Sequence, residues 1–209
     1  MIKKDYLMRS LMFVPAHNER LMRSASKSDA DILLLDIEDS VQPVENKQVA
    51  RDCIIKYIKE GYFSDRVLFP RVNDRESGEL LKDVYQLTIE GIEGFMYPKS
   101  KKGEDIYSDV EISVFEAVSG TTKIINMLQT QICPKCGGRK GFPVGTFKII
   151  PLIETASSVM NVQDICNACP NRVVAIAFGC EDFVSDLEGK HDLEGKSIFT
   201  ARAMVAMGA

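Results

Sequence analysis

The stretch Lys148-Ile-Ile-Pro-Leu-Ile-Glu-Thr155 decides the fold class of this chain. Its residues 149–153 are all apolar, which is typical of a strand buried on both faces of a parallel sheet. The run ends in Glu154, and Thr155 is a residue type that often begins a helix as its N-cap. Catalytic groups of parallel α/β folds gather at the carboxyl ends of the strands. Glu154 is therefore a candidate site residue, the alternative being a carboxylate that only stabilises the next helix.

The same pattern of a short apolar run followed by a helical stretch recurs along the chain. Besides residues 148–153, the expected strands cover residues 11–14, 32–37, 67–72, 94–97 and 173–178. The expected helices cover residues 18–28, 44–60, 77–90, 104–118, 157–168 and 193–207. Six βα units in succession predict an α/β fold in one domain, with a parallel sheet and right-handed crossovers.

The number of units indicates which parallel fold this is. A (β/α)8 TIM barrel usually needs about 250 residues, so we expect six βα units in 209 residues to form an incomplete TIM barrel. An open doubly wound sheet is the alternative. The turn after the first strand, Pro15-Ala-His-Asn18, lacks the glycine-rich pattern of a dinucleotide site, which disfavours that alternative.

Composition excludes several classes of protein. The chain is 45% hydrophobic and 27% charged with a net charge of −4, which predicts an ordinary globular protein without affinity for nucleic acid. No apolar run approaches the roughly 20 residues that span a bilayer, and residues 1–10 lack the apolar core of a signal peptide. The sequence predicts a cytoplasmic protein.

Charged and polar side chains follow most of the expected strands. They are Glu38 and Asp39, Arg71 and Asn73, Lys99, Glu154, and Glu181 and Asp182. Several partly buried carboxylates in one place are unfavourable unless they share a cation. Arg71 can offset one carboxylate, and Mg²⁺ is commonly held by one or two carboxylates together with water and substrate oxygens. We therefore expect a Mg²⁺ site, and the alternative is a network of salt bridges.

These segments resemble the citrate lyase beta subunit and malyl-CoA lyase family of aldolases, within the HpcH/HpaI aldolase superfamily. The resemblance is carried in order by RSLMFVP at 9–15, LDIEDSV at 35–41 with Lys47 and Arg51, Arg71-Val72-Asn73, Pro98-Lys99, Ile153-Glu154-Thr155 and FGCED at 178–182, and it extends to residue 205. It implies a TIM barrel enzyme that uses Mg²⁺ to make or break a carbon–carbon bond. The implied substrates are a small 2-oxo acid and an acyl thioester, often of coenzyme A.

The resemblance also implies which residues serve the reaction. Glu154 and Asp182 match the positions that hold Mg²⁺, and Arg71 matches the arginine that binds an oxygen of the oxo acid. A metal ion and a fixed guanidinium would both stabilise the negative charge that develops on an enolate. Glu38 and Asp39 match an acidic pair that we expect to orient Arg71 and metal-bound water, or to act directly as acid and base.

Three further residues have two interpretations each. Lys47 and Lys99 would contact phosphates or the thioester, and the alternative for each is a solvated lysine. His17 stands in the turn after the first strand, where the family usually has a glycine after the proline, and it is either a site base or ligand contact or an ordinary loop histidine.

The length of the chain opens a second functional hypothesis. The family continues beyond residues 201–205 with the last two barrel strands and a C-terminal lid. We therefore expect either a fragment, or a rim completed by a partner chain in a homo-oligomer, or a protein that no longer catalyses the reaction. The alternative function is that of a non-catalytic, accessory homologue which assembles with partner subunits.

A cysteine-containing insertion is expected at residues 121–146, before the strand at 148–153. Cys133 and Cys136 form a C-x2-C pair, and Cys166 and Cys169 form a second pair with the same spacing. Four thiolates on the lower rim of the barrel would make a closed structural Zn²⁺ site. The alternatives are a disulfide, which is disfavoured in the cytoplasm, and free thiols. Cys53 and Cys180 are expected to be lone buried thiols.

Overall fold

The computed structural model describes residues 7–101, 148–168, 172–192 and 194–209. Within these ranges the strands are β1 (Leu11–Pro15), β2 (Ile32–Asp36), β3 (Val67–Leu68), β4 (Gly94–Tyr97), β5 (Lys148–Ile153) and β6 (Ala177–Phe178). All pairings are parallel, in the orders β1-β2-β3 and β4-β5-β6. Isolated bridges from Arg71 to Asp36 and to Met96 join the two sets. The chain is therefore an α/β protein whose described strands follow one another in chain order.

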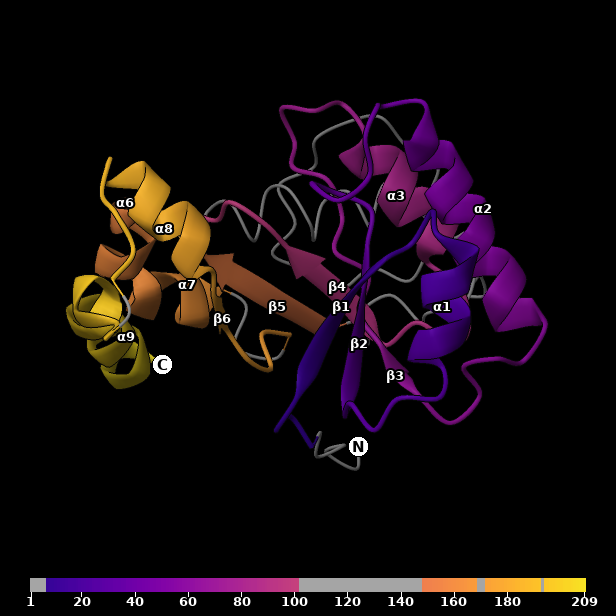
Figure 1. The fold of residues 1–209 in the computed structure, drawn as a ribbon, viewed down its shortest axis with the longest axis horizontal. Helices are drawn as coiled ribbons and strands as arrows, with labels where there is room; N and C mark the ends of the chain where they lie inside the picture. Colours follow the sequence, from indigo (N-terminus) through magenta and orange to yellow (C-terminus); the bar gives the residue numbers. More distant parts are fainter. Residues whose placement is uncertain (1–6, 102–147, 169–171, 193) are drawn as a thin grey trace.

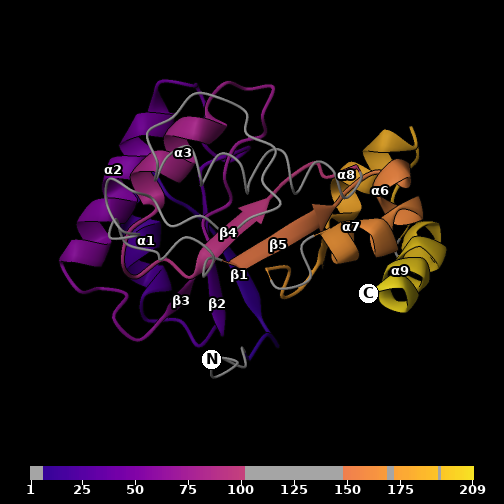
Figure 2. The same cartoon turned by 180° about the vertical axis from the view of Figure 1, so that it is seen from behind.

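The helices form two groups (Figure 1). One group packs beside β1 to β4 and consists of α1 (Glu19–Ala25), α2 (Asn46–Lys59) and α3 (Leu80–Leu87). The other group gathers around the carboxyl end of β5, as Figure 2 shows from behind, and consists of α6 (Ala156–Met160), α7 (Val162–Ala168), α8 (Cys180–Asp186) and α9 (Lys196–Gly208). No helix in the described part of the chain is long and apolar enough to cross a membrane.

The sheet has packed side chains on both faces. Side chains alternate along a strand, so Leu33 and Leu35 of β2 belong to the large core that includes the helices. Ile32 and Leu34 point the other way and pack in a second cluster with Phe69, Met96, Ile150 and Leu152. The burial of both faces explains why β2 and β5 are almost continuously apolar in sequence.

The expected strands are confirmed in order and position, but the third and sixth are shorter. The third was expected at residues 67–72 and is regular only over β3. Pro70 follows and has no amide hydrogen to donate to a strand ladder. The amides of Phe69 and Arg71 still donate to the carbonyls of Leu33 and Leu35 at 3.0 Å each, so the chain continues along β2 without regular strand geometry.

The helices differ from expectation at two places. Thr155 is confirmed as an N-cap, because its hydroxyl accepts from the Ser158 amide at 3.1 Å. The single helix expected at 157–168 is instead two helices, α6 and α7, separated at Asn161. Helix α8 was not expected at all, and it begins directly after Gly179. The helix expected at 104–118 and the insertion at 121–146 lie outside the described residues.

Candidate functional site

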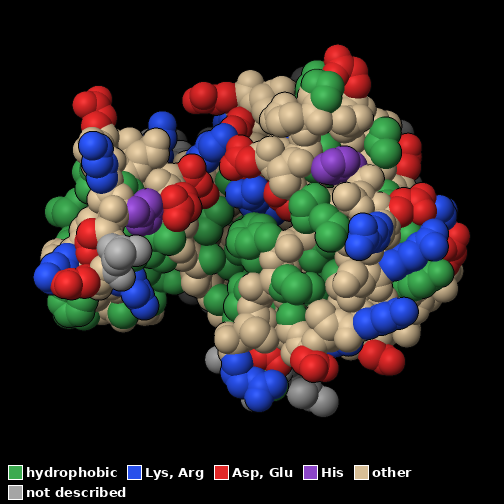
Figure 3. All heavy atoms as spheres, viewed as in Figure 1, with side chains coloured by type: hydrophobic (Ala, Val, Ile, Leu, Met, Phe, Trp, Pro, Cys, Tyr) green, Lys and Arg blue, Asp and Glu red, His purple; other side chains and the backbone are tan. Residues whose placement is uncertain are grey.

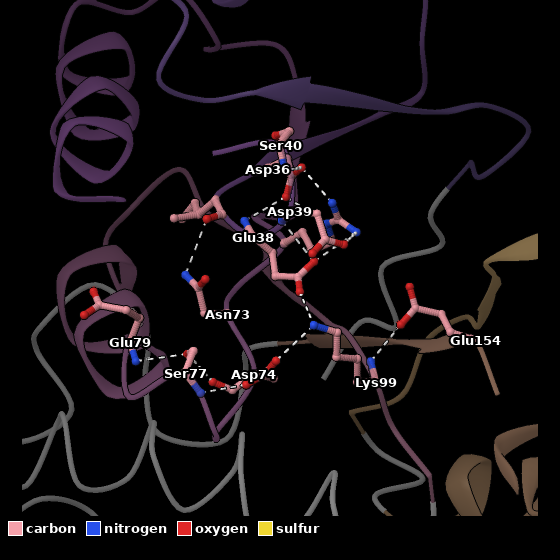
Figure 4. Close-up of polar contacts among 12 residues, drawn as sticks. Asp36, Glu38, Asp39, Ser40, Asn73, Asp74, Ser77, Glu79, Lys99 and Glu154 are labelled. Atoms are coloured by element: carbon pink, nitrogen blue, oxygen red, sulfur yellow. Dashed lines mark hydrogen bonds and ion pairs between the residues drawn. The ribbon is translucent and has the colours of Figure 1, made fainter. Parts of the chain in front are cut away.

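Charged side chains from several strands meet at the carboxyl end of the sheet. In Figure 4, Glu38 and Glu154 lie on either side of Lys99, which follows β4. Glu38, Arg71 and Glu154 are each less than a tenth exposed. The surface view shows acidic and basic side chains together between the part that carries α6 to α9 and the larger part of the molecule, beside a patch of apolar side chains (Figure 3). The expected clustering of strand-end charges is therefore present in the fold.

Arg71 is fixed in position by Asp36. Its Nε donates to Asp36 Oδ1 at 2.8 Å and its Nη2 donates to Oδ2 at 2.7 Å, which is the two-pronged pairing that a guanidinium makes with a carboxylate. The guanidinium also lies over the Phe13 ring, 5.0 Å from its centroid. The remaining nitrogen, Nη1, is 3.3 Å from Glu38 Oε2 and 3.4 Å from Asp39 Oδ2. Arg71 thus presents one prong to the acidic pair.

Asp36 is a site residue that the sequence analysis did not single out. Burial raises the pKa of Asp36, but the hydrogen bonds and the charge of Arg71 lower it by a larger amount. The pKa therefore lies below its ordinary value. The carboxylate stays ionised and holds the guanidinium. This was the role expected for Glu38 and Asp39, whose contacts with Arg71 are longer.

Lys99 connects the two sides of the site. Its ammonium donates to Glu38 Oε1 at 2.7 Å and to Asp74 Oδ2 at 3.1 Å, while its backbone amide donates to Glu154 Oε2 at 2.9 Å. The residue has a φ of 56°, a left-handed conformation that is uncommon for a residue with a long side chain. The side chain is 48% exposed, so its ammonium remains accessible to solvent and to a ligand.

Glu154 lies against the turn between β6 and α8. A Cβ added to Gly179 would be 2.8 Å from Glu154 Cγ, so only glycine leaves the carboxylate in this place. Asp182 lies three residues further along, in the first turn of α8, and it is exposed. Its charge acts on Glu154. Asp182 is therefore near enough for its charge to raise the pKa of Glu154, and the assignment of both residues to a metal stays a prediction.

The electrostatics of the site show an excess of negative charge. Burial raises the pKa of Glu154 to about 7, and the charges of Asp182 and Glu38 add to the effect despite the Lys99 amide. Burial and the neighbouring Asp39 raise the pKa of Glu38 to about 7 as well, although Lys99 and Arg71 act in the opposite direction. A divalent cation bound near these two carboxyl groups would stabilise their ionised forms.

Lys47 is not the solvated lysine of its alternative interpretation. It is buried, and its ammonium donates to the carbonyls of Ile37 and Glu38 at 2.9 and 2.6 Å. Burial lowers its pKa. In this position the ammonium is shielded from solvent, and its contact with a phosphate or a thioester stays a prediction. It holds the segment after β2 in the shape that aims Glu38 at the site.

A second buried group supports the segment after β3. Asn73 donates its amide N–H and its Nδ2 to Asp83 Oδ2 at 2.7 Å each. Asp83 in turn accepts from Arg51 Nε at 2.7 Å, and Arg51 also pairs with Glu79. These hydrogen bonds attach the segment around Asn73, one of the strand-end residues, to α3.

The remaining candidates are His17 and the cysteines, of which only some lie within the described residues. His17 is partly buried, and its Nδ1 has no hydrogen-bond partner among the described residues. Three of the four cysteines expected to bind Zn²⁺ lie outside the described residues, so that site stays a prediction; they are Cys133, Cys136 and Cys169. Cys53 is buried as expected, whereas Cys180 is only partly buried, because it lies in the first turn of α8 and not in a core strand.

Comparisons with known proteins agree on one group of enzymes. A family model described as HpcH/HpaI aldolase/citrate lyase matches residues 9–209. The citrate lyase subunit beta of Leuconostoc mesenteroides subsp. cremoris is 25% identical over 208 residues, which is 100% of this chain and 62% of that protein. The L-malyl-CoA/beta-methylmalyl-CoA lyase of Rhodobacter capsulatus is 28% identical over 185 residues, which is 87% of this chain and 51% of that protein. The chain therefore spans only part of the length of these relatives.

Solved structures show the same fold. The citrate lyase beta subunit from Mycobacterium tuberculosis complexed with oxaloacetate and magnesium has a TM-score of 0.62 at 18% identity, covering 95% of this chain and 72% of that chain. The protein CitE from the same organism, in complex with magnesium, acetoacetate and coenzyme A, has a TM-score of 0.61 at 19% identity, covering 97% and 63%. At these identities the likeness establishes the α/β fold with parallel strands.

Proposed function

The chain belongs to the HpcH/HpaI aldolase/citrate lyase family, and from this premise we propose that it acts as a Mg²⁺-dependent carbon–carbon lyase. Its substrate would be a small oxo- or hydroxy-acid, carried as an acyl thioester such as that of coenzyme A. The observation that carries the proposal is the pair of buried carboxyl groups, Glu38 and Glu154, on either side of Lys99, each with a pKa of about 7.

We assign the metal to Glu154 and Asp182. One buried and one exposed carboxylate suit Mg²⁺, which commonly takes one or two carboxylates and leaves its other positions to water and substrate oxygens. When bound, the ion would act as a Lewis acid toward the oxygens of the substrate. The Lys99 amide orients Glu154 for this task through its 2.9 Å hydrogen bond.

Arg71 is proposed to bind an oxygen of the acid. Its paired bonds to Asp36 fix the guanidinium before the substrate arrives, so little reorganisation is needed when negative charge develops nearby. Its Nη1 lies beside Glu38 and Asp39 at the looser distances of 3.3 and 3.4 Å. A substrate oxygen can take the place of these longer contacts without disturbing the pair with Asp36.

Glu38 is proposed as the acid–base residue. In the cleavage direction the substrate hydroxyl loses its proton and becomes a carbonyl, and the electrons of the broken carbon–carbon bond form the enolate of the thioester. The enolate then takes up a proton. A carboxyl group with a pKa of about 7 exchanges protons efficiently near neutral pH. Asp39, which is exposed, and the Lys99 ammonium lie beside it.

The proposal is tested by thermal shift with Mg²⁺ and oxaloacetate or pyruvate. A ligand present at about 100 times its Kd adds about 2.7 kcal/mol of stability, which raises Tm by about 5 to 10 °C in a chain of this size. We expect the shift to disappear in Glu154→Ala and Asp182→Ala and to persist in Glu188→Ala, the same change at an exposed carboxylate just after α8. A folded wild-type chain that shows no shift would instead support the accessory function.

The four-cysteine Zn²⁺ site is a separate proposal. It rests on the spacing of Cys133, Cys136, Cys166 and Cys169 in the sequence. Metal analysis of the purified chain is expected to find zinc that is lost in Cys133→Ser. Retention of the full zinc content by that variant would contradict this assignment and would leave the lyase proposal unaffected.

A further inference from the structure

A second group of potential metal ligands lies on α8 and in the loop after it. Cys180 Sγ, a carboxylate oxygen of Glu181 and an imidazole nitrogen of His191 all lie within 4.8 Å of one another. The closest measured pair is His191 Nε2 and Glu181 Oε2, at 3.0 Å. The Glu181 side chain is 82% exposed and that of His191 is 37% exposed. Nothing in the proposed lyase chemistry uses these three residues.

The loop that carries His191 is anchored at both ends. At its start the Gly189 amide donates to the Val184 carbonyl at 2.9 Å, which ties the loop to α8. At its end the Asp192 carboxylate accepts from the Ser197 amide at 2.7 Å at the start of α9. The backbone therefore holds the imidazole near α8.

The geometry matches the needs of a tetrahedral ion. Zn²⁺ binds sulfur at about 2.3 Å and nitrogen or oxygen at about 2.0 to 2.2 Å, so its ligand atoms are roughly 3.3 to 3.7 Å from one another. Glu181 and His191 are already near this separation. Cys180 Sγ is no more than 4.8 Å from either of them, which is at most about 1 Å beyond the upper end of this range.

The ligand types select the metal. A thiolate and an imidazole favour a borderline-soft ion such as Zn²⁺ over Mg²⁺, which prefers oxygen ligands. We propose that Cys180, Glu181 and His191 form a Zn²⁺ site with three protein ligands, whose fourth position is open to water or to a small ligand.

This site is distinct from the proposed Mg²⁺ site, although both use the first turn of α8. Asp182 acts electrostatically on Glu154, whereas Glu181 pairs with His191. Adjacent residues on one helical turn point about 100° apart, so the two carboxylates serve different directions. The zinc inference does not rest on the lyase proposal, because it uses none of the same ligands.

The test is a titration of the full chain with Zn²⁺ and with Co²⁺, whose thiolate complexes absorb in the near ultraviolet. Wild type is expected to bind one more equivalent than Cys180→Ser. His191→Ala removes no sulfur, so a weaker cobalt–thiolate band in that variant shows that Cys180 and His191 share an ion. We expect Zn²⁺ affinity at this site to fall at least about tenfold in His191→Ala and in Glu181→Gln, since even residues outside the coordination shell are worth about 10- to 100-fold.

The chain offers matched controls. His17→Ala changes the other of its two histidines, and Glu188→Gln changes a neighbouring exposed carboxylate; both are expected to keep the extra equivalent. Counting equivalents against Cys180→Ser separates this ion from any bound by the other cysteines. Equal stoichiometry and equal affinity in wild type and His191→Ala, with both proteins folded by circular dichroism, would overturn the proposal. Loss of Mg²⁺ binding in Glu154→Gln with the zinc equivalent retained would show that the two sites are independent.

Discussion

The substitution Glu154→Gln tests whether the charge of Glu154, at the carboxyl end of β5, destabilises the folded chain. Burial, with the charges of Asp182 and Glu38, raises the pKa of Glu154 from the ordinary 4.5 to about 7. Glutamine keeps an oxygen that can accept from the Lys99 amide, as the carboxylate does at 2.9 Å. The substitution therefore removes a charge and retains most of the local structure.

The sign of the pH dependence follows from this raised pKa. Between about pH 4.5 and pH 7 the folded chain still holds a proton at Glu154 that the unfolded chain has lost, so the free energy of unfolding falls as the pH rises. At about 1.4 kcal/mol per pKa unit, the difference between 4.5 and about 7 corresponds to an upper value of about 3 kcal/mol. Without Mg²⁺, Glu154→Gln is expected to be more stable than wild type by about 1 to 3 kcal/mol at about pH 8, and nearly equal to it at about pH 4.

Urea unfolding in a chelating buffer, repeated across this pH range, measures the difference. Adding Mg²⁺ is expected to reverse its sign, because the wild-type carboxylate can bind the ion and the neutral amide binds it weakly. Equal stability of the two proteins at about pH 8 in the chelating buffer would refute the idea that the carboxylate is electrostatically unfavourable. A failure of Mg²⁺ to reverse the sign would refute the assignment of Glu154 as a metal ligand.

Three further substitutions test the structure around the site. Arg71→Lys is expected to lower the free energy of unfolding by about 3 kcal/mol, because one ammonium cannot replace both bonds to buried Asp36; an unchanged urea midpoint would contradict this. Lys47→Met should lower it by about 1 to 3 kcal/mol in the same assay, since two carbonyls lose a charged donor, and a loss below about 0.5 kcal/mol would count against that role. Gly179→Ala would place a Cβ 2.8 Å from Glu154 Cγ and is expected to weaken Mg²⁺ binding in a thermal shift titration, whereas an unchanged affinity would show that the carboxylate can move aside.

The strands were predictable where burial dominates the sequence. Strands β2 and β5 are buried on both faces, and their continuous apolar runs identified them. The third strand was placed correctly, but its regular part ends at Leu68, because Pro70 removes one amide from the ladder. Helix α8 was missed because its seven residues, Cys180–Asp186, are too few for a 3.6-residue period to stand out.

The site was predictable to the extent that strand ends determine it. The rule that parallel strands present their functional groups at the carboxyl end located Arg71, Lys99 and Glu154. It missed Asp36, which is the last residue of a strand that is otherwise apolar. A signal was present, because a buried carboxylate requires a cation and Arg71 follows the neighbouring strand. The role of Lys47 could not be foreseen, since sequence does not show which carbonyls a long side chain will reach.

The three hydrogen bonds of Lys99 bear on how a ligand would enter the site. Its amide is fixed in the backbone and must stay with Glu154, whereas its ammonium is 48% exposed and shared between Glu38 and Asp74. An arriving anion therefore competes with those two carboxylates for the ammonium, whose side chain can rotate. The hydrogen bond from the Lys99 amide to Glu154 is retained. Entry of the anion would release Glu38 from its counterion at the moment when a proton acceptor is needed.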